Sequence, residues 1–292
     1  MDEKPGTGLL GATSLVGECV IPLLIEDGRR VFAYSRTASG RATEAGLTWL
    51  RPGEPFPPHA EAAAIGDWLC VAPIWTLPEY FSMLERHGAR RVVALSSTSR
   101  FSKINSSDAA ENATASRLAE SEASLQEWAE SKGIEWVILR PTLIYGRGRD
   151  KNIAEIARFV KRFGFFPLLG KAEGRRQPIH AEDVAAACAS ALRVARAANR
   201  AYDISGGETL SYREMVMRVF SSLRRPSRTV TIPLAIFRMA AAYLRLFPRY
   251  RNWSAAMAER MNVDLAFDHA DAARELGFSP RPFRLAPDDL PE

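Results

Sequence analysis

The chain has 292 residues and a formal net charge of +5, with 47% hydrophobic and 25% charged residues. These proportions are typical of a soluble globular protein, and the length suffices for one large domain or for a domain with a smaller lobe. The basic residues are scattered and never interleaved with aromatics in a continuous run, which argues against a nucleic-acid-binding function.

A glycine-bounded turn stands close to the N-terminus, in the run Leu-Leu-Gly-Ala-Thr-Ser-Leu-Val-Gly of residues 9–17. Gly11 and Gly17 allow a strand to turn sharply into a helix at 15–26, whose first N–H groups are free to bind a phosphate. Dinucleotide folds hold a pyrophosphate in this way, although Ser14 stands where a third glycine is usual. Residues 5–10 are a poor strand by composition, so a plain glycine turn before an ordinary helix is the alternative.

Apolar runs alternate with helical patterns through the first half of the chain. Strands are expected at 30–34, 47–50, 68–72, 91–96 and 136–139, with helices at 77–87 and 113–132 between them. Continuous apolar strands separated by helices predict a doubly wound parallel sheet, an α/β fold of Rossmann type. We expect residues 1–150, completed by about 178–205, to form the dinucleotide-binding domain.

The second half is less regular. Helices are expected at 152–163, 181–195 and 211–223 and a strand at 201–204, and Ser211 with Glu214 three residues later forms a capping box. Residues 151–177 and 206–292 are therefore predicted to form a smaller, mostly helical substrate lobe.

The run 232–247 is apolar but too short to span a membrane, and it carries Arg238 and Arg245. A lobe helix with one basic face is the favoured interpretation. Attachment to a membrane surface, aided by Arg249 and Arg251, is the alternative.

The cysteines Cys19, Cys70 and Cys188 lie far apart in apolar stretches. Their number and positions predict buried free thiols in a reducing compartment, and we expect a cytoplasmic protein. Neither the cysteines nor the four histidines have the spacing of metal ligands, so no metal is predicted. No basic-plus-apolar leader is present, so no signal peptide is expected.

Five motifs follow one another along the chain: the glycine turn at 11–17, Leu-Ser-Ser-Thr-Ser at 95–99, Leu-Arg-Pro-Thr-Leu-Ile-Tyr-Gly at 139–146, Arg-Gln-Pro-Ile-His-Ala-Glu-Asp-Val-Ala at 176–185 and Ser-Gly-Gly-Glu at 205–208. In this order they resemble the extended and atypical short-chain dehydrogenases/reductases, the NAD-dependent epimerase/dehydratase group. The resemblance covers nearly the whole chain. It implies a nicotinamide dinucleotide, a small-molecule substrate and a homodimer through the helices at 77–87 and 113–132.

Arg36 follows the second predicted strand, where side chains of this fold contact the 2′ position of the ribose. A carboxylate there would accept a hydrogen bond from a 2′-hydroxyl, whereas an arginine would form an ion pair with a 2′-phosphate. Ser35 adds a hydroxyl donor. We therefore predict NADP(H) over NAD(H), with Arg41 able to share the role and an exposed arginine at a strand end as the alternative. The resemblance implies further cofactor contacts at Gly11, Thr13, Ser14, Leu15, Val16, Gly17, Ala72, Pro73, Ser96, Arg117 and Pro141.

The hydroxyl-rich end of the fifth strand is the candidate catalytic segment. The resemblance implies that Thr98 forms a hydrogen bond with the substrate oxygen, with Ser97 as the alternative residue. A hydroxyl-rich turn that caps a strand is the alternative.

Two candidates lie on the substrate side. Arg176 resembles the arginine that holds a substrate diphosphate in nucleotide-sugar enzymes, and Tyr145 is the second candidate. We expect His180 to connect a loop to Asp183 rather than to perform acid–base chemistry, and Asp183 to cap or orient the helix that follows.

The chain departs from the family at its catalytic Tyr-x-x-x-Lys pair. No tyrosine lies between Tyr80 and Tyr145, and the two positions fall on Ala113 and Arg117. The general acid is therefore missing, and arginine is a poor proton donor because its pKa stays high.

Three hypotheses follow. The chain is an NADP(H)-dependent oxidoreductase or epimerase-like enzyme on a small or nucleotide-linked substrate, with Thr98 and a water, Lys103 or Tyr145 as the acid. Alternatively, it is a catalytically silent NADP(H)-binding sensor or assembly protein. In the third hypothesis it acts at a membrane surface on a lipid-linked substrate. Ala113 at the usual tyrosine position favours the second hypothesis over an ordinary family enzyme. The residues Ser97, Thr98, Pro141 and Arg176 favour the first, which is our prediction.

Overall fold

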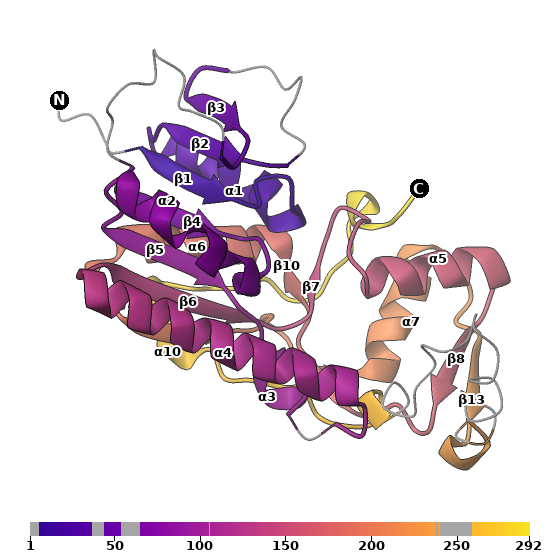
Figure 1. Cartoon of the computed structure of the whole chain (residues 1–292). Helices are drawn as coiled ribbons and strands as arrows, with labels where there is room; N and C mark the ends of the chain where they lie inside the picture. The colour runs from indigo at the N-terminus through magenta and orange to yellow at the C-terminus, as the bar shows by residue number, and fades with distance from the viewer. Residues whose placement is uncertain (1–5, 37–43, 54–64, 105, 238, 240–258) are drawn as a thin grey trace.

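Seven parallel strands form the main sheet of the computed structural model, which describes residues 6–36, 44–53, 65–104, 106–237, 239 and 259–292 (Figure 1). The order in the sheet is β11-β6-β5-β4-β1-β2-β3. The chain builds the sheet outward from β1 in both directions, which is the doubly wound arrangement, so the predicted Rossmann-type α/β fold is confirmed. The strands are β1 (Thr7–Leu10), β2 (Val31–Tyr34), β3 (Leu47–Leu50), β4 (Asp67–Cys70), β5 (Arg91–Leu95), β6 (Glu135–Pro141) and β11 (Arg200–Ile204).

Helices cover both faces of this sheet. Successive strand residues point to opposite faces, so Leu9 and Val93 pack into one apolar layer while Leu10 and Val92 pack into the other. The first layer contains α1 (Leu15–Glu26), α6 (Ala181–Arg193) and α10 (Ala270–Leu276), and the second contains the 3₁₀ segment η2 (Ile74–Tyr80), α2 (Phe81–Arg86) and α4 (Ala109–Lys132).

Residues 7–10 form a strand although their composition is poor for one, because β1 is fully buried within the sheet. The alternative of a plain glycine turn before the helix is therefore wrong. A Cβ on Gly8 would lie 2.3 Å from the Trp68 ring, and one on Gly6 would lie 2.6 Å from the Phe32 ring. These glycines leave room for large aromatic rings on the neighbouring strands. Composition alone does not reveal that role.

Two predicted helices differ in their bounds. The helix expected at 77–87 is divided into η2 and α2, and Pro78 lies inside η2. The helix expected from residue 113 begins at Ala109, where Asp108 caps it by accepting a hydrogen bond from the Ala110 N–H. The Phe81 and Trp128 rings stack at 4.0 Å, so these helices pack on each other within one chain. A homodimer through them stays a prediction.

A second apolar cluster gathers beside the sheet, at the end of the molecule away from β3 (Figure 1). It is built on α5 (Ile153–Phe163), α7 (Tyr212–Ser222) and the parallel pair β8 (Phe166–Leu169) and β13 (Thr229–Ile232). The capping box of Ser211 and Glu214 opens α7, as predicted. The remaining short elements are α3 (Ser99–Ser102), β7 (Ile144–Tyr145), β9 (Arg175–Arg176), β10 (Ile179–His180), η3 (Ala195–Ala197), β12 (Leu210–Ser211) and η5 (Pro287–Asp289).

All three cysteines are buried and free, as their spacing predicted. Among the described residues, no cluster of His, Cys, Asp and Glu is arranged to hold a metal ion. No helix within the described ranges is long and apolar enough to cross a membrane. Most of the predicted helix at 232–247 lies outside the described residues, as do Arg41, Arg238, Arg245, Arg249 and Arg251.

Candidate functional site

The strand order reverses between β1 and β4, and the loops that leave these strands touch. A Cβ on Gly11 would lie only 2.5 Å from the Ala72 backbone nitrogen, and Gly11 has a φ of +84°, which favours glycine. The exposed Pro73 follows on the same loop. Open α/β sheets bind ligands at this point, outside the carboxyl ends of the strands. The fold therefore brings these predicted residues to the expected edge.

The turn between β1 and α1 presents the N-terminus of a helix. A Cβ on Gly17 would lie 2.4 Å from the Gly11 carbonyl oxygen, so the turn closes tightly only with glycine. Ser14 is the N-cap, and its Oγ accepts a 3.0 Å hydrogen bond from the Gly17 N–H. Its φ of −71° is ordinary for any residue, so serine brings no backbone strain. The first-turn N–H groups of Leu15 and Val16 lack intrahelical acceptors and are suitable donors for an anion.

The end of β2 lies beside this turn. The Thr13 and Ser35 hydroxyl oxygens are 3.3 Å apart, and Ser35 is buried. Arg36 follows and is exposed, without an ion pair to any residue that the structure describes. The glycine turn, the helix N–H groups and this cation together fit the pyrophosphate and ribose of a dinucleotide.

The hydroxyl groups after β5 are largely engaged within the protein. Ser96 Oγ donates to Glu122 Oε1 at 2.5 Å, and Thr98 Oγ1 donates to the Pro141 carbonyl at 3.2 Å. Thr98 is buried. The half-buried Ser97 accepts a hydrogen bond from the backbone N–H two residues later, which leaves its proton for another partner. Of the two predicted catalytic hydroxyls, the one on Ser97 is the more accessible.

Ala113 and Arg117 lie exposed on α4, four residues and about one turn apart. The Arg117 guanidinium lies 4.8 Å from the centre of the Trp75 ring, a cation–π contact with η2. Neither side chain can serve as a proton donor at neutral pH, since alanine has no proton to give and arginine stays charged.

Sequence reasoning missed Glu122, which is fully buried on α4. Its carboxylate accepts hydrogen bonds from three side chains. Arg140 Nη2 lies 2.7 Å from Glu122 Oε2, and Arg100 and Ser96 also donate to this carboxylate. The network joins α4 to the ends of β5 and β6 and includes the 3.7 Å pair between Arg140 and Asp203. Burial raises the pKa of Asp203 although Arg140 opposes the shift. A sequence signal did exist, because Glu122 continues the apolar positions 118, 125 and 129 of the helix.

Tyr145 lies in the second apolar cluster rather than at the edge of the sheet. It is fully buried with edge-on contacts to the His180 and Phe283 rings, and its hydroxyl donates to the Arg284 carbonyl at 3.3 Å. Burial raises the pKa of Tyr145 to about 12. The fold thus packs this side chain into the lobe, and its assignment to a substrate stays a prediction.

Arg176 is buried as well. Its guanidinium donates to the carbonyls of Arg175 at 2.6 Å, Val263 at 2.8 Å and Arg260. Burial lowers the pKa of Arg176 to about 10, and no carboxylate among the described residues forms an ion pair with it. These carbonyls occupy much of its donor capacity, and a diphosphate contact stays a prediction.

The expected link between His180 and Asp183 is wrong. His180 Nδ1 accepts the Glu182 N–H at 3.2 Å and so caps α6, while Nε2 lies 3.0 Å from Asp289 Oδ1. Because the cap fixes Nδ1 at the helix end, Nε2 points toward η5 instead. Asp183 pairs with Arg281 at 2.9 Å.

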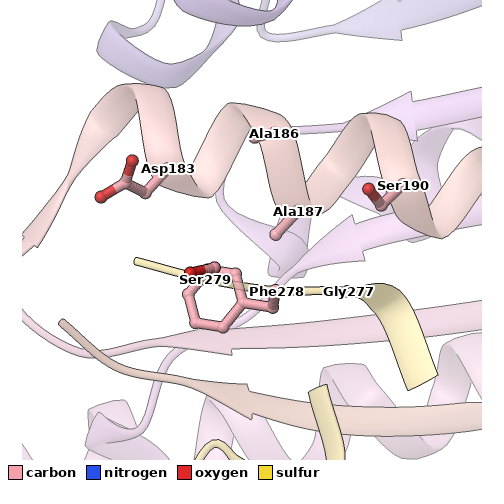
Figure 2. A pocket seen from close by; sticks show the side chains of 7 residues that line it. All are labelled: Asp183, Ala186, Ala187, Ser190, Gly277, Phe278 and Ser279. Carbon is pink, nitrogen blue, oxygen red and sulfur yellow. The ribbon is translucent and has the colours of Figure 1, made fainter. Parts of the chain in front are cut away.

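A small pocket of about 140 Å³ lies between α6 and the segment after α10 (Figure 2). Asp183, Ala186, Ala187 and Ser190 line it from α6, opposite residues 277–279. Ligand pockets usually measure about 300–1,000 Å³. This pocket is too small for a dinucleotide and does not include the glycine turn.

The doubly wound sheet, with a glycine turn at its switch point, defines a protein of the Rossmann dinucleotide-binding class. Residues 79–205 match the model of the NAD dependent epimerase/dehydratase family. The match agrees with the family that the motifs resemble, and it covers residues 79–205, less than half of the chain.

Similar proteins include UDP-glucose 4-epimerase of Vibrio cholerae, 24% identical over 55% of this chain and 47% of that protein. Subunit 9 of the NADH dehydrogenase [ubiquinone] 1 alpha subcomplex, mitochondrial, of Arabidopsis thaliana is 29% identical over 44% of this chain and 32% of that protein. The chain thus spans less than half the length of the curated relatives it matches.

Among solved structures, UDP-glucose 4-epimerase of Thermus thermophilus in complex with NAD is similar, with a TM-score of 0.65. The match covers 97% of this chain and 95% of that chain at 16% identity. At this identity the likeness extends to the fold alone.

Proposed function

We propose that the chain binds a nicotinamide dinucleotide at the carboxyl ends of β1 and β4 and prefers NADP(H) to NAD(H). The observation that carries this proposal is the close approach of the Gly11 turn to Ala72 at the point where the strand order reverses. The N–H groups of α1 supply donors for the pyrophosphate. The family match and the structural neighbour that holds NAD support the class of cofactor.

Arg36 supports the preference for the phosphorylated cofactor. It is exposed at the end of β2, close to Ser35 and the glycine turn, and it has no carboxylate partner in the described structure. A guanidinium in this position gains a charge-assisted hydrogen bond with a 2′-phosphate. With a 2′-hydroxyl it would gain little.

A bound nicotinamide supplies hydride-transfer chemistry, but the chain's own proton donors are poorly placed for the family's usual reaction. Ala113 and Arg117 stand at the positions of the usual pair, Thr98 donates to a carbonyl and Tyr145 is buried in the lobe. These observations favour a catalytically silent binding protein, a sensor or an assembly factor. The similarity to an NADH dehydrogenase subunit points the same way.

An oxidoreductase or epimerase-like enzyme on a small or nucleotide-linked substrate is the second candidate. It is favoured by the half-buried Ser97, whose hydroxyl proton is not engaged by any described residue. It is also favoured by the similarity to UDP-glucose 4-epimerase of Vibrio cholerae.

The test is to titrate the purified chain with NADPH, NADP⁺, NADH and NAD⁺ by calorimetry. Tight binding of the phosphorylated pair alone is the expected result. Equal affinity for all four would remove the NADP(H) preference, and binding of none would refute the proposal. Incubation of the loaded protein with UDP-glucose, followed by chromatography of the sugar nucleotides, then separates the silent protein from the enzyme.

A further inference from the structure

The free end of the second apolar cluster carries exposed apolar and basic side chains together. We call this surface the lobe tip and define it as residues 161–165 and 224–230, at the ends of α5 and α7 and the start of β13. Figure 1 shows these elements at the side of the molecule opposite β1, β2 and β3. The lobe tip is separate from the dinucleotide edge and takes no part in the proposed function.

Hydrogen bonds hold the two segments of the lobe tip side by side. Arg225 Nη1 donates to the carbonyls of Val160 and Lys161, both at 3.0 Å. The Phe166 N–H donates to the Arg228 carbonyl at 2.9 Å, where β8 and β13 begin to pair. The surface is therefore a fixed part of the fold.

Three large apolar side chains of the lobe tip face solvent. Phe163 is 51% exposed, Phe165 is 36% exposed and Val230 is 50% exposed. Because Phe166 points into the core, the alternation along the strand directs Phe165 outward. The Phe163 and Phe165 rings lie 6.5 Å apart, so they form one patch.

The charge of the lobe tip is of one sign. Arg162, Arg224 and Arg228 are exposed, and no described carboxylate forms an ion pair with them. Elsewhere the chain does pair its arginines, as in the contacts of Arg158 with Glu155 and of Arg218 with Glu208. The sequence has no Asp or Glu between 156 and 172 or between 215 and 258.

We propose that the lobe tip docks on a membrane surface that contains anionic phospholipids. The guanidinium groups bind headgroup phosphates while the phenylalanines and the valine enter the boundary between headgroups and acyl chains. A single-stranded nucleic acid would need open ring faces for stacking. Here the Phe159, Phe163 and Phe165 rings pack against one another at 45° and 85°, and Val230 offers no ring.

The test is co-sedimentation of the full chain with phosphatidylcholine vesicles containing about 30% phosphatidylserine, compared with phosphatidylcholine alone. We expect binding to the anionic vesicles only, and release as salt is raised. The variant R162S/R228S should bind about tenfold more weakly, since each surface arginine adds several-fold to partitioning. Its control, R86S/R90S, removes the same charge from α2 and the turn after it, away from the lobe tip.

A second pair of variants tests the apolar part. Phe163→Ser/Phe165→Ser should lose most of the vesicle binding, whereas Ile104→Ser, which removes a side chain that is 59% exposed elsewhere, should retain it. An unchanged unfolding midpoint shows that each variant folds. No binding to anionic vesicles, or equal binding by the tip and control variants, would overturn the proposal. If the lobe-tip variants bind heparin more weakly than the parent does but bind vesicles equally well, the surface would be assigned to a soluble polyanion.

Discussion

The carboxylate of Glu122 lies 2.7 Å from the Arg140 guanidinium and joins the middle of α4 to the end of β6. Glu122 is fully buried, and the Arg140 side chain is 15% exposed. Both groups have lost most of their hydration, so each needs the other as a partner for its hydrogen bonds. The pair stands directly behind the hydroxyl-rich segment after β5, which it holds through Ser96.

Replacement of Glu122 by glutamine should destabilise the fold by about 3 kcal/mol, because it removes the buried carboxylate that Arg100 and Arg140 share and leaves Arg140 only its longer contact with Asp203. Urea unfolding measures the effect as a lower midpoint with an unchanged slope. Glu120→Gln, an exposed change on the same helix, is the control and should stay within about 0.5 kcal/mol. Equal stability of the two variants would show that the buried pair contributes nothing to the free energy of unfolding.

Arg36→Ala should reduce the affinity for NADPH about tenfold and leave that for NADH unchanged, because only NADPH carries the 2′-phosphate. Calorimetric titration of both cofactors measures the difference. Arg86→Ala removes an exposed arginine at the opposite end of the strands and is the control for net charge. A similar loss of affinity for both cofactors would mean that Arg36 does not contact the 2′-phosphate.

Ser14 should act chiefly as a helix cap. Ser14→Ala removes the acceptor of the Gly17 N–H and should cost about 1 kcal/mol, whereas Ser14→Gly should cost only a few tenths. Thermal unfolding measures whether Ser14→Ala is less stable than Ser14→Gly. If Ser14→Gly also binds NADPH several-fold more tightly, the serine Cβ restricts the approach of the phosphate, and unchanged affinity would show that it does not.

Asp289 should give the fold a stability that is lost in acid. Burial alone would raise the pKa of Asp289, but hydrogen bonds from His180 and backbone N–H groups bring it below its usual value. The unfolded-state pKa is about 3.9. The ionised carboxylate therefore contributes its full stabilisation above that value and loses it as pH falls through the lower folded-state pKa. Urea midpoints of the parent and Asp289→Asn should differ at pH 7, begin to approach each other below about pH 4 and converge only below the lower folded-state pKa of Asp289.

Thr98→Val should cost about 1 kcal/mol of stability, because the buried hydroxyl no longer bonds the Pro141 carbonyl. Thr98→Ser keeps the donor and serves as the matched variant. Affinity for NADPH should be unchanged in both. Where a nucleotide-sugar substrate is turned over, loss of turnover in Thr98→Val with retention in Thr98→Ser would assign Thr98 to the reaction.

Local sequence patterns were enough to predict the class of fold and the turn at its ligand edge. Strands that are buried on both faces read as continuous apolar runs, so local composition located β2, β4, β5 and β6. The partly buried edge strands β3 and β11 also lie at predicted positions. Helix α1 has the predicted bounds, since Ser14 and the glycines are local signals. The capping box of Ser211 and Glu214 is equally local.

Which side chains meet depends on how the helices and strands pack in three dimensions. Glycines made residues 5–10 a poor strand by composition, yet Gly8 is needed to accommodate Trp68 from β4. His180 was expected to contact Asp183 but contacts Asp289, which lies more than a hundred residues along the chain. Propensity and spacing describe neighbours within a few residues. Partners joined by packing across the sheet and the lobe leave no such local trace.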